Sequence, residues 1–187
     1  MASKNCLDLI IKDHEKLKSL HSQYMSTSDT DKKQELANTL IKELCIHSSL
    51  EETLVYPVLR DRVPEGKNLA HDAYEDHFAV ERLLDEMLSM KVKDDEAKFD
   101  SKMNTMIENL FAHIQHEEGK LLPLLRQYIY PNELVELGGK MESNRPLMPT
   151  HPHPNMPKEG VKGMVAGLAA APLDRAYDAA RSAVSGQ

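Results

Sequence analysis

Residues 47–59 read HSSLEETLVYPVL, and residues 113–125 read HIQHEEGKLLPLL. Both stretches follow one pattern, HxxxEExxxxPxL, in which a histidine and a glutamate are four residues apart. Four residues make about one helical turn, so the histidine and the first glutamate of each stretch share one face of a helix. The proline that follows removes one helical hydrogen bond, so we expect a kink at Pro57 and at Pro123.

Each stretch is preceded by a segment that carries an Asp-His pair. Asp13-His14 lies before the first stretch and Asp76-His77 before the second, and apolar residues follow each pair at helical spacing. The chain therefore contains two copies of one helical hairpin. Two such hairpins packed about a pseudo-twofold axis would bring four histidines and two glutamates together.

Apolar residues recur at helical spacing through most of the chain, and no stretch shows sustained strand-like alternation. Short connections between long helices make antiparallel neighbours. We therefore expect an all-α fold, an up-down-up-down four-helix bundle with a turn at 63–66. The expected helices cover, approximately, residues 5–26, 31–60, 67–90 and 95–129.

Most of the ten prolines and eight glycines lie after residue 130. This shift in composition divides the chain into a bundle at 1–130 and a C-terminal extension at 131–187. We expect the extension to pack back on the bundle or on a second subunit, which makes it a candidate homodimer contact. Its expected parts are a short helix at 132–143, an extended linker rich in proline and histidine at 145–157, and an amphipathic helix at 158–185.

The composition excludes several function classes. The 187 residues are 41% hydrophobic and 28% charged, which is typical of a globular protein. The net charge of -7 and pI near 5.7 argue against a nucleic-acid partner, which would need a basic surface. We expect no membrane span and no secretory signal. Cys6 and Cys45 form no CxxC motif, and we interpret them as reduced interior thiols of a cytoplasmic protein.

The repeated histidines and glutamates lie on the apolar stripes of their helices. Burying an ionised carboxylate without a partner costs several kcal/mol, out of a total stability of roughly 5–15 kcal/mol. Since these stripes carry almost no basic residues, metal cations would supply the compensating charge, and imidazole with carboxylate suits iron, manganese or zinc. The predicted metal ligands are His14, His47, Glu51, His77, His113 and Glu117.

Six ligands exceed what one tetrahedral site uses, so we expect two metal ions, bridged by Glu51 and Glu117. Three more residues are candidates for additional ligands or for groups that hydrogen-bond the ligands. Tyr74 and Glu81 lie one turn before and after the third histidine, and Glu118 follows the second bridge. We assign no general acid or base, so the catalytic residues stay unknown.

This set of residues resembles the hemerythrin-like HHE cation-binding domain family, whose pattern is H…HxxxE…H…HxxxE. The resemblance covers about residues 7–130 and implies a four-helix bundle that holds two non-haem iron ions with bridging carboxylates. It further implies a small ligand such as O2, peroxide or NO. Ala73 stands where the oxygen-carrying hemerythrins have a further histidine, and Glu117 replaces an aspartate that those proteins place one residue later. These departures favour redox or iron-handling roles over reversible oxygen carriage.

Three function classes remain open from the residues alone. The leading one is a di-iron protein that binds or reduces small oxidants or handles iron. The second is a zinc or iron storage or sensing module without turnover. The third is a haem-binding bundle, because facing histidines and apolar side chains also hold haem. The repeated HxxxE argues against haem, which needs no bridging carboxylates.

Overall fold

The computed structural model of the chain describes residues 5–155, 169–176 and 178. Within these ranges the chain forms helices, turns and irregular segments, and no strand occurs there. The predicted all-α fold is therefore confirmed. Of the helix expected at 158–185, residues 169–176 and 178 are helical, and the rest lies outside the described residues.

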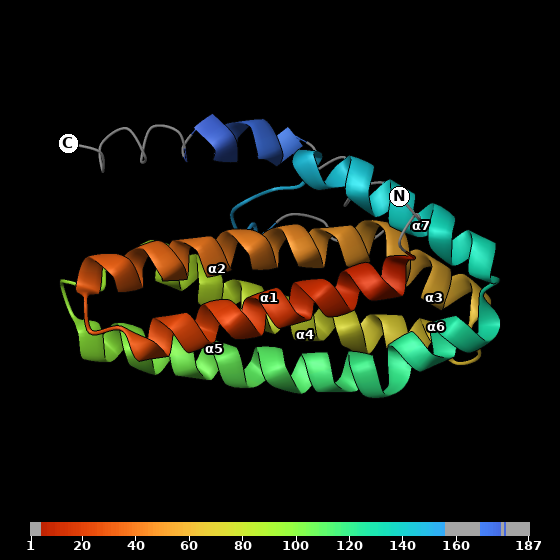
Figure 1. Cartoon of the computed structure of the whole chain (residues 1–187), viewed down its shortest axis with the longest axis horizontal. Coiled ribbons are helices and arrows are strands. Elements are labelled where there is room, and N and C mark those ends of the chain that lie inside the picture. Colours follow the sequence, from red (N-terminus) through yellow and green to blue (C-terminus); the bar gives the residue numbers. More distant parts are fainter. Residues whose placement is uncertain (1–4, 156–168, 177, 179–187) are drawn as a thin grey trace.

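Four long helices form an antiparallel bundle (Figure 1). The two helices of each hairpin pack against each other, and α2 also contacts α4. Figure 1 shows the α1–α2 and α4–α5 connections together at one end of the bundle. The four helices are α1 (Cys6–Ser26), α2 (Thr30–Leu50), α4 (Gly66–Leu88) and α5 (Glu96–His116).

The α2 and α5 arms are interrupted at matching places by single π-helical turns, η1 (Glu51–Val55) and η2 (Glu117–Leu121). Each turn is closed by a bond from the residue before a proline, since the N–H of Tyr56 donates to Glu51 and that of Leu122 to Glu117. A proline ring would clash with the carbonyl four residues earlier in a regular α-helix, and the wider turn removes that clash. The arms then continue as α3 (Tyr56–Arg62) and α6 (Leu122–Tyr128). The kinks expected inside helices at 31–60 and 95–129 thus take the form of π turns that divide each helix.

The predicted turn at 63–66 brings α3 and α4 into close contact. Glu65 adopts a left-handed conformation with φ of 60°, and α4 begins at the next residue. A Cβ at Gly66 would lie 2.0 Å from the carbonyl oxygen of Leu59. Only glycine therefore permits this close approach of the two helices.

The bundle core consists of two apolar clusters with a polar layer between them. One cluster includes Leu59 and Leu125 and fills the end formed by α3 and α6. The other includes Leu40 and Phe99 and fills the end with the α1–α2 connection. Along α1, Ile10 belongs to the first cluster and Leu17 to the second. The residues midway along the four long helices therefore face each other between two apolar walls.

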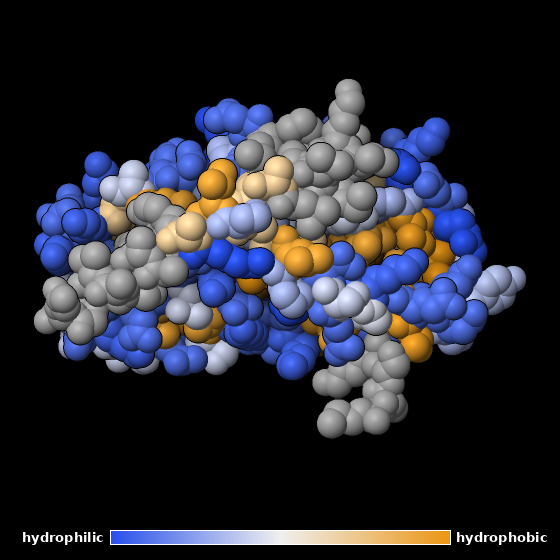
Figure 2. Space-filling model, turned by 90° about the horizontal axis from the view of Figure 1, so that it is seen from above, coloured by the Kyte–Doolittle hydropathy of each residue, from blue (hydrophilic) through white to orange (hydrophobic). Residues whose placement is uncertain are grey.

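The described part of the extension packs back on the bundle. α7 (Pro131–Asn144) lies against α1 and η1 and buries Leu134, Leu137 and Met141 in the first apolar cluster. A short 3-10 turn, η3 (Arg145–Leu147), follows. Figure 2 looks down on this face and shows apolar residues gathered along its middle with hydrophilic residues around them. None of the described helices is long and apolar enough to cross a membrane.

Candidate metal centre

The polar layer between the two apolar clusters contains all six predicted ligand residues. Their side chains belong to two groups, and within each group the possible donor atoms all lie within 4.8 Å of one another. Glu51 is a member of both. The first group is His14, His47, Glu51 and Glu117, and the second is Glu51, His77 and His113.

Local structure places each donor. The histidines of the two HxxxE pairs lie in the last turns of α2 and α5, and each glutamate opens the π turn that follows. The i,i+4 spacing puts Glu51 Oε2 3.2 Å from His47 Nε2 and Glu117 Oε2 3.4 Å from His113 Nε2. The single histidines of α1 and α4 complete the layer from the opposite side. His14 Nε2 is 3.2 Å from Glu117 Oε2, and His77 Nε2 is 3.5 Å from Glu51 Oε2.

The donor atoms are buried and poorly satisfied by protein groups. All six residues are at most 5% exposed. Both carboxylate oxygens of Glu51 and Oε2 of Glu117 have no hydrogen-bond partner among the described residues, and the same holds for Nε2 of His14 and of His47. Leaving a buried carboxylate unpaired is costly. Two donor atoms that bind the same metal ion at about 2.0–2.2 Å lie about 3 to 3.5 Å from each other. The distances between histidine nitrogens and glutamate oxygens in this layer match that separation. The residues present therefore fit a metal centre.

In three of the four histidines, Nδ1 donates a hydrogen bond to a carboxylate that lies on the side of the ring away from Nε2. Glu118 accepts from His14 at 2.8 Å and Glu52 from His77 at 3.0 Å. Asp76 takes the same position behind His113 at 3.3 Å. Such outer carboxylates orient a metal-binding imidazole so that Nε2 faces the metal. Glu118, a candidate for either role, thus contacts a predicted ligand and is absent from both donor groups.

The other two additional candidates form hydrogen bonds with backbone groups. The hydroxyl of Tyr74 donates to the backbone carbonyl of Glu52 at 2.9 Å. The carboxylate of Glu81 accepts the backbone N–H of His153 at 2.8 Å, at the surface of α4. Glu81 is absent from both donor groups.

Sequence reasoning missed Tyr56, the first residue of α3. Its hydroxyl donates to Glu117 Oε1 at 2.9 Å and lies 3.1 Å from His77 Nε2. The side chain is 1% exposed. The corresponding residue of the second stretch is Leu122, so a tyrosine at this place in one stretch alone was the available signal.

Protons stabilise the layer when no metal is bound. Burial lowers the pKa of His113, but the carboxylates of Glu117, Asp76 and Glu51 together outweigh burial and raise that pKa to about 10. Burial and His113 lower the pKa of His77, yet Glu51 and Glu52 raise it to about 9. Burial opposes ionisation of Glu117, and His113 nevertheless holds its pKa well below the usual range. Metal ions would have to displace these protons, which makes metal uptake pH-dependent.

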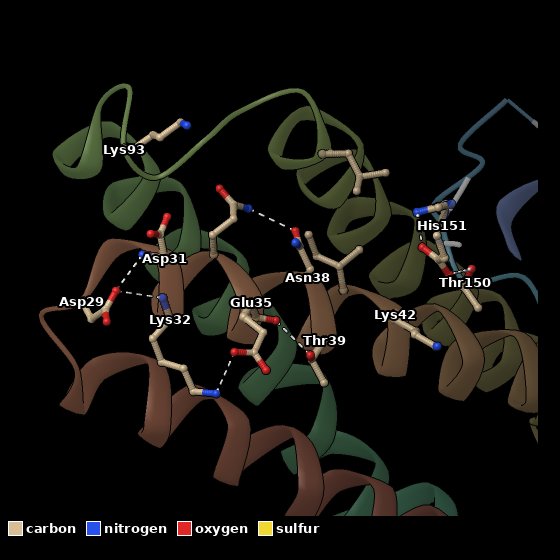
Figure 3. A pocket seen from close by; sticks show the side chains of 14 residues that line it. Asp29, Asp31, Lys32, Glu35, Asn38, Thr39, Lys42, Lys93, Thr150 and His151 are labelled. Carbon is tan, nitrogen blue, oxygen red and sulfur yellow. Dashed lines mark hydrogen bonds and ion pairs between the residues drawn. The ribbon is translucent and has the colours of Figure 1, made fainter. Parts of the chain in front are cut away.

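A separate surface pocket of about 940 Å³ lies along the first half of α2 (Figure 3). Figure 3 shows charged and polar side chains such as Asp29, Lys32 and Glu35 on one side and Thr150 and His151 on the other. None of the six converging residues lines it. The pocket is therefore distinct from the metal centre.

Residues 6–125 match the hemerythrin HHE cation binding domain. The chain belongs to the hemerythrin HHE family. This hemerythrin-like chain is 33% identical over 172 residues to a hemerythrin-like protein of Schizosaccharomyces pombe. The match covers 91% of this chain and 84% of that protein. The family and the buried donor groups together support metal-cation binding.

Two further likenesses extend the comparison. A crystal structure of a hemerythrin HHE cation binding domain-containing protein from Mycobacterium kansasii superposes with a TM-score of 0.65 at 25% identity. It covers 76% of this chain and 85% of that chain. A DNA nickase of Nostoc sp. is 26% identical over 122 residues, 65% of this chain but 34% of the nickase. Most of the nickase therefore lies outside the hemerythrin-like match.

Proposed function

We propose that this hemerythrin-like protein holds a non-haem di-iron carboxylate centre that binds or reduces small oxidants such as O2, peroxide or NO, or handles iron, in the cytoplasm. The environment of Glu51 is the observation that supports the proposal. It is fully buried, both its oxygens lack a hydrogen-bond partner among the described residues, and it belongs to both donor groups. A carboxylate in that position is suited to bridge two cations.

In this proposal His14, His47, His77 and His113 are terminal ligands, and Glu51 and Glu117 are bridges. The donor set is imidazole nitrogen and carboxylate oxygen, which suits iron and also manganese or zinc. Neither cysteine is in a donor group, although both are buried. The absence of thiolate among these donors argues against the sulfur-rich sites typical of structural zinc.

The bound iron would supply the one- or two-electron redox chemistry and a Lewis-acidic position for the oxidant. The chain itself supplies the surroundings. The two apolar clusters exclude water on both sides of the layer. Tyr56 holds Oε1 of Glu117 by a hydrogen bond, which leaves Oε2 directed at His14 and His113.

The geometry disfavours haem. The Nε2 atoms of His77 and His113 are 3.0 Å apart and their ring centroids 4.5 Å apart, which leaves no room for a porphyrin between them. The burial of all six donors instead favours, as a second candidate, a closed iron or zinc module for storage or sensing without turnover. Turnover with peroxide separates the two candidates.

The test begins with removal of metal by a chelator, followed by anaerobic loading with Fe(II) and measurement of iron per chain. We expect two irons per chain and, after exposure to air, near-ultraviolet bands of an oxo-bridged pair. Repeated additions of peroxide then distinguish catalysis from a single bleaching step. Glu81→Gln is the matched control, because Glu81 lies outside the donor groups. Binding of less than one iron per chain at saturating Fe(II), or an intense Soret band in the purified protein, would overturn the proposal.

A further inference from the structure

His47 is the one histidine of the layer that lacks a hydrogen bond at Nδ1. The other three Nδ1 atoms lie 2.8 to 3.3 Å from a carboxylate oxygen. His47 Nδ1 is buried, has no hydrogen-bond partner among the described residues, and lies 3.8 Å from Oδ2 of Asp13. Asp13 and Asp76 occupy equivalent places in the two Asp-His pairs. The first hairpin therefore departs from the second at this contact.

A residue of the C-terminal extension contacts this aspartate. Oδ2 of Asp13, the oxygen nearest His47, accepts a hydrogen bond from Arg145. Arginine is always charged and forms strong charge-assisted bonds with carboxylates. Asp76 has no arginine or lysine partner among the described ion pairs, and it sits closer to its own histidine. Arg145 thus competes with His47 for a carboxylate whose counterpart is free of such competition.

The position of Arg145 is set by the packing of the extension. Arg145 follows directly on α7, whose Leu137 and Met141 are buried against the bundle. Farther along, the backbone N–H of His153 donates to Glu81 of α4. The arginine is therefore held between two attachments of the extension to the bundle.

We propose that Arg145 is a positioning residue for the metal centre, which holds Asp13 away from His47 and so makes the metal position of His14 and His47 weaker than that of His77 and His113. The proposal rests on the proposed function, since it presupposes two bound metal ions. Outer carboxylates typically change metal affinity by about 10- to 100-fold when they are lost. The docked extension would then set how unequal the two positions are.

The experiment follows release of Co(II) from the loaded 187-residue chain to a coloured chelator in excess. The parent should release two ions in two phases. Arg145→Ala and Arg145→Gln should both slow the faster phase about 10-fold, because Asp13 becomes free to accept from His47, and should leave the slower phase unchanged. Arg145→Lys, which keeps the positive charge, should stay near the parent.

Two controls separate this effect from simple loosening of the extension. Arg62→Ala removes an exposed ion pair between α3 and Glu133 of α7, far from the donor groups, and should leave both phases unchanged. The double variant Asp13→Ala, Arg145→Ala should lose the slowing, since the effect acts through Asp13.

Equal release of both ions from the parent would overturn the inference. So would unchanged or faster release from both Arg145→Ala and Arg145→Gln, or slowing that survives in the double variant. Binding of fewer than two Co(II) ions by the parent would instead count against the proposed function, and the two failures are thereby distinguishable.

Discussion

The two hairpins of the bundle carry the same pattern and the same π turn, yet they surround the metal centre differently. The first places Tyr56 where the second has Leu122, and its Asp13 is bound by Arg145 while Asp76 is not. Repetition thus accounts for a near-symmetric set of donors. The exchange of Tyr56 for Leu122 and the arginine of the extension make the two halves unequal.

The symmetric features of the metal centre include hydrogen bonds that join the two hairpins. Glu118 of the second hairpin accepts from His14 of the first, and Glu52 of the first accepts from His77 of the second. Each hairpin therefore orients a histidine of the other. Neither hairpin alone would present a complete half of the centre.

We expect the largest effect from replacing Glu51, which the two donor groups share. Because Glu51 belongs to both donor groups and Glu117 to one, Glu51→Met should remove more of the bound iron than Glu117→Met. In the metal-free protein at neutral pH Glu51→Met should lower the free energy of unfolding by about 3–5 kcal/mol, since it removes one partner of the buried ion pair with His77. Metal content and chemical denaturation measure the two effects. Retention of two irons by Glu51→Met would contradict the bridging role.

The next effect concerns pH and the histidines of the second hairpin. Without metal, the pKa values of His77 and His113 are about 9 and about 10, above the value of about 6.5 expected in the unfolded chain. Their contribution to stability is therefore complete below about pH 6.5 and is lost as the pH rises through 9 to 10, a loss of several kcal/mol. NMR titration of the imidazoles and denaturation at several pH values would measure it.

The metal-loaded protein is the control for this titration, because bound metal replaces the protons. It should not show the same loss of stability. His21 offers a second control within the same spectra, since burial lowers its pKa. Titration of His77 and His113 below pH 7 in the metal-free protein would contradict the prediction.

A smaller effect tests the polar difference between the hairpins. Tyr56→Phe removes the hydroxyl that donates to Glu117 and should lower the free energy of unfolding of the metal-free protein by about 1–2 kcal/mol. Tyr128→Phe is the matched control, because Tyr128 is 42% exposed and lies outside the layer. Equal stability of the two variants would show that the Tyr56 hydroxyl adds nothing to the layer.

The smallest effect concerns the outer carboxylate of the first metal position. Lys18 pairs with Glu118 at 3.2 Å, and both side chains are partly exposed. Exposed pairs contribute roughly 0–1 kcal/mol, so Lys18→Ala should lower the thermal midpoint only slightly. The His14–Glu118 bond should remain. A decrease of more than about 2 kcal/mol in the free energy of unfolding would mean that Lys18 is needed to keep Glu118 hydrogen-bonded to His14.

Sequence reasoning located the helices and all six converging side chains because both follow from local spacing. The i,i+4 pairs of the two stretches and the apolar stripes around them needed no tertiary information. The π turns were expected only as kinks, since Pro57 and Pro123 signal a broken bond without specifying how the turn relaxes. Tyr56 was missed because a tyrosine on an apolar face is ordinarily a packing residue.

By itself, the sequence determined the repeat, the faces of the helices and the identity of the candidate ligands, because each of these depends on residues within a few turns of one another. Only the tertiary structure decided which carboxylate accepts a hydrogen bond from which histidine. Glu118 and His14 are 104 residues apart, and Arg145 and Asp13 are 132 apart. Contacts at such separations depend on how whole helices pack, and helical periodicity carries no information about them.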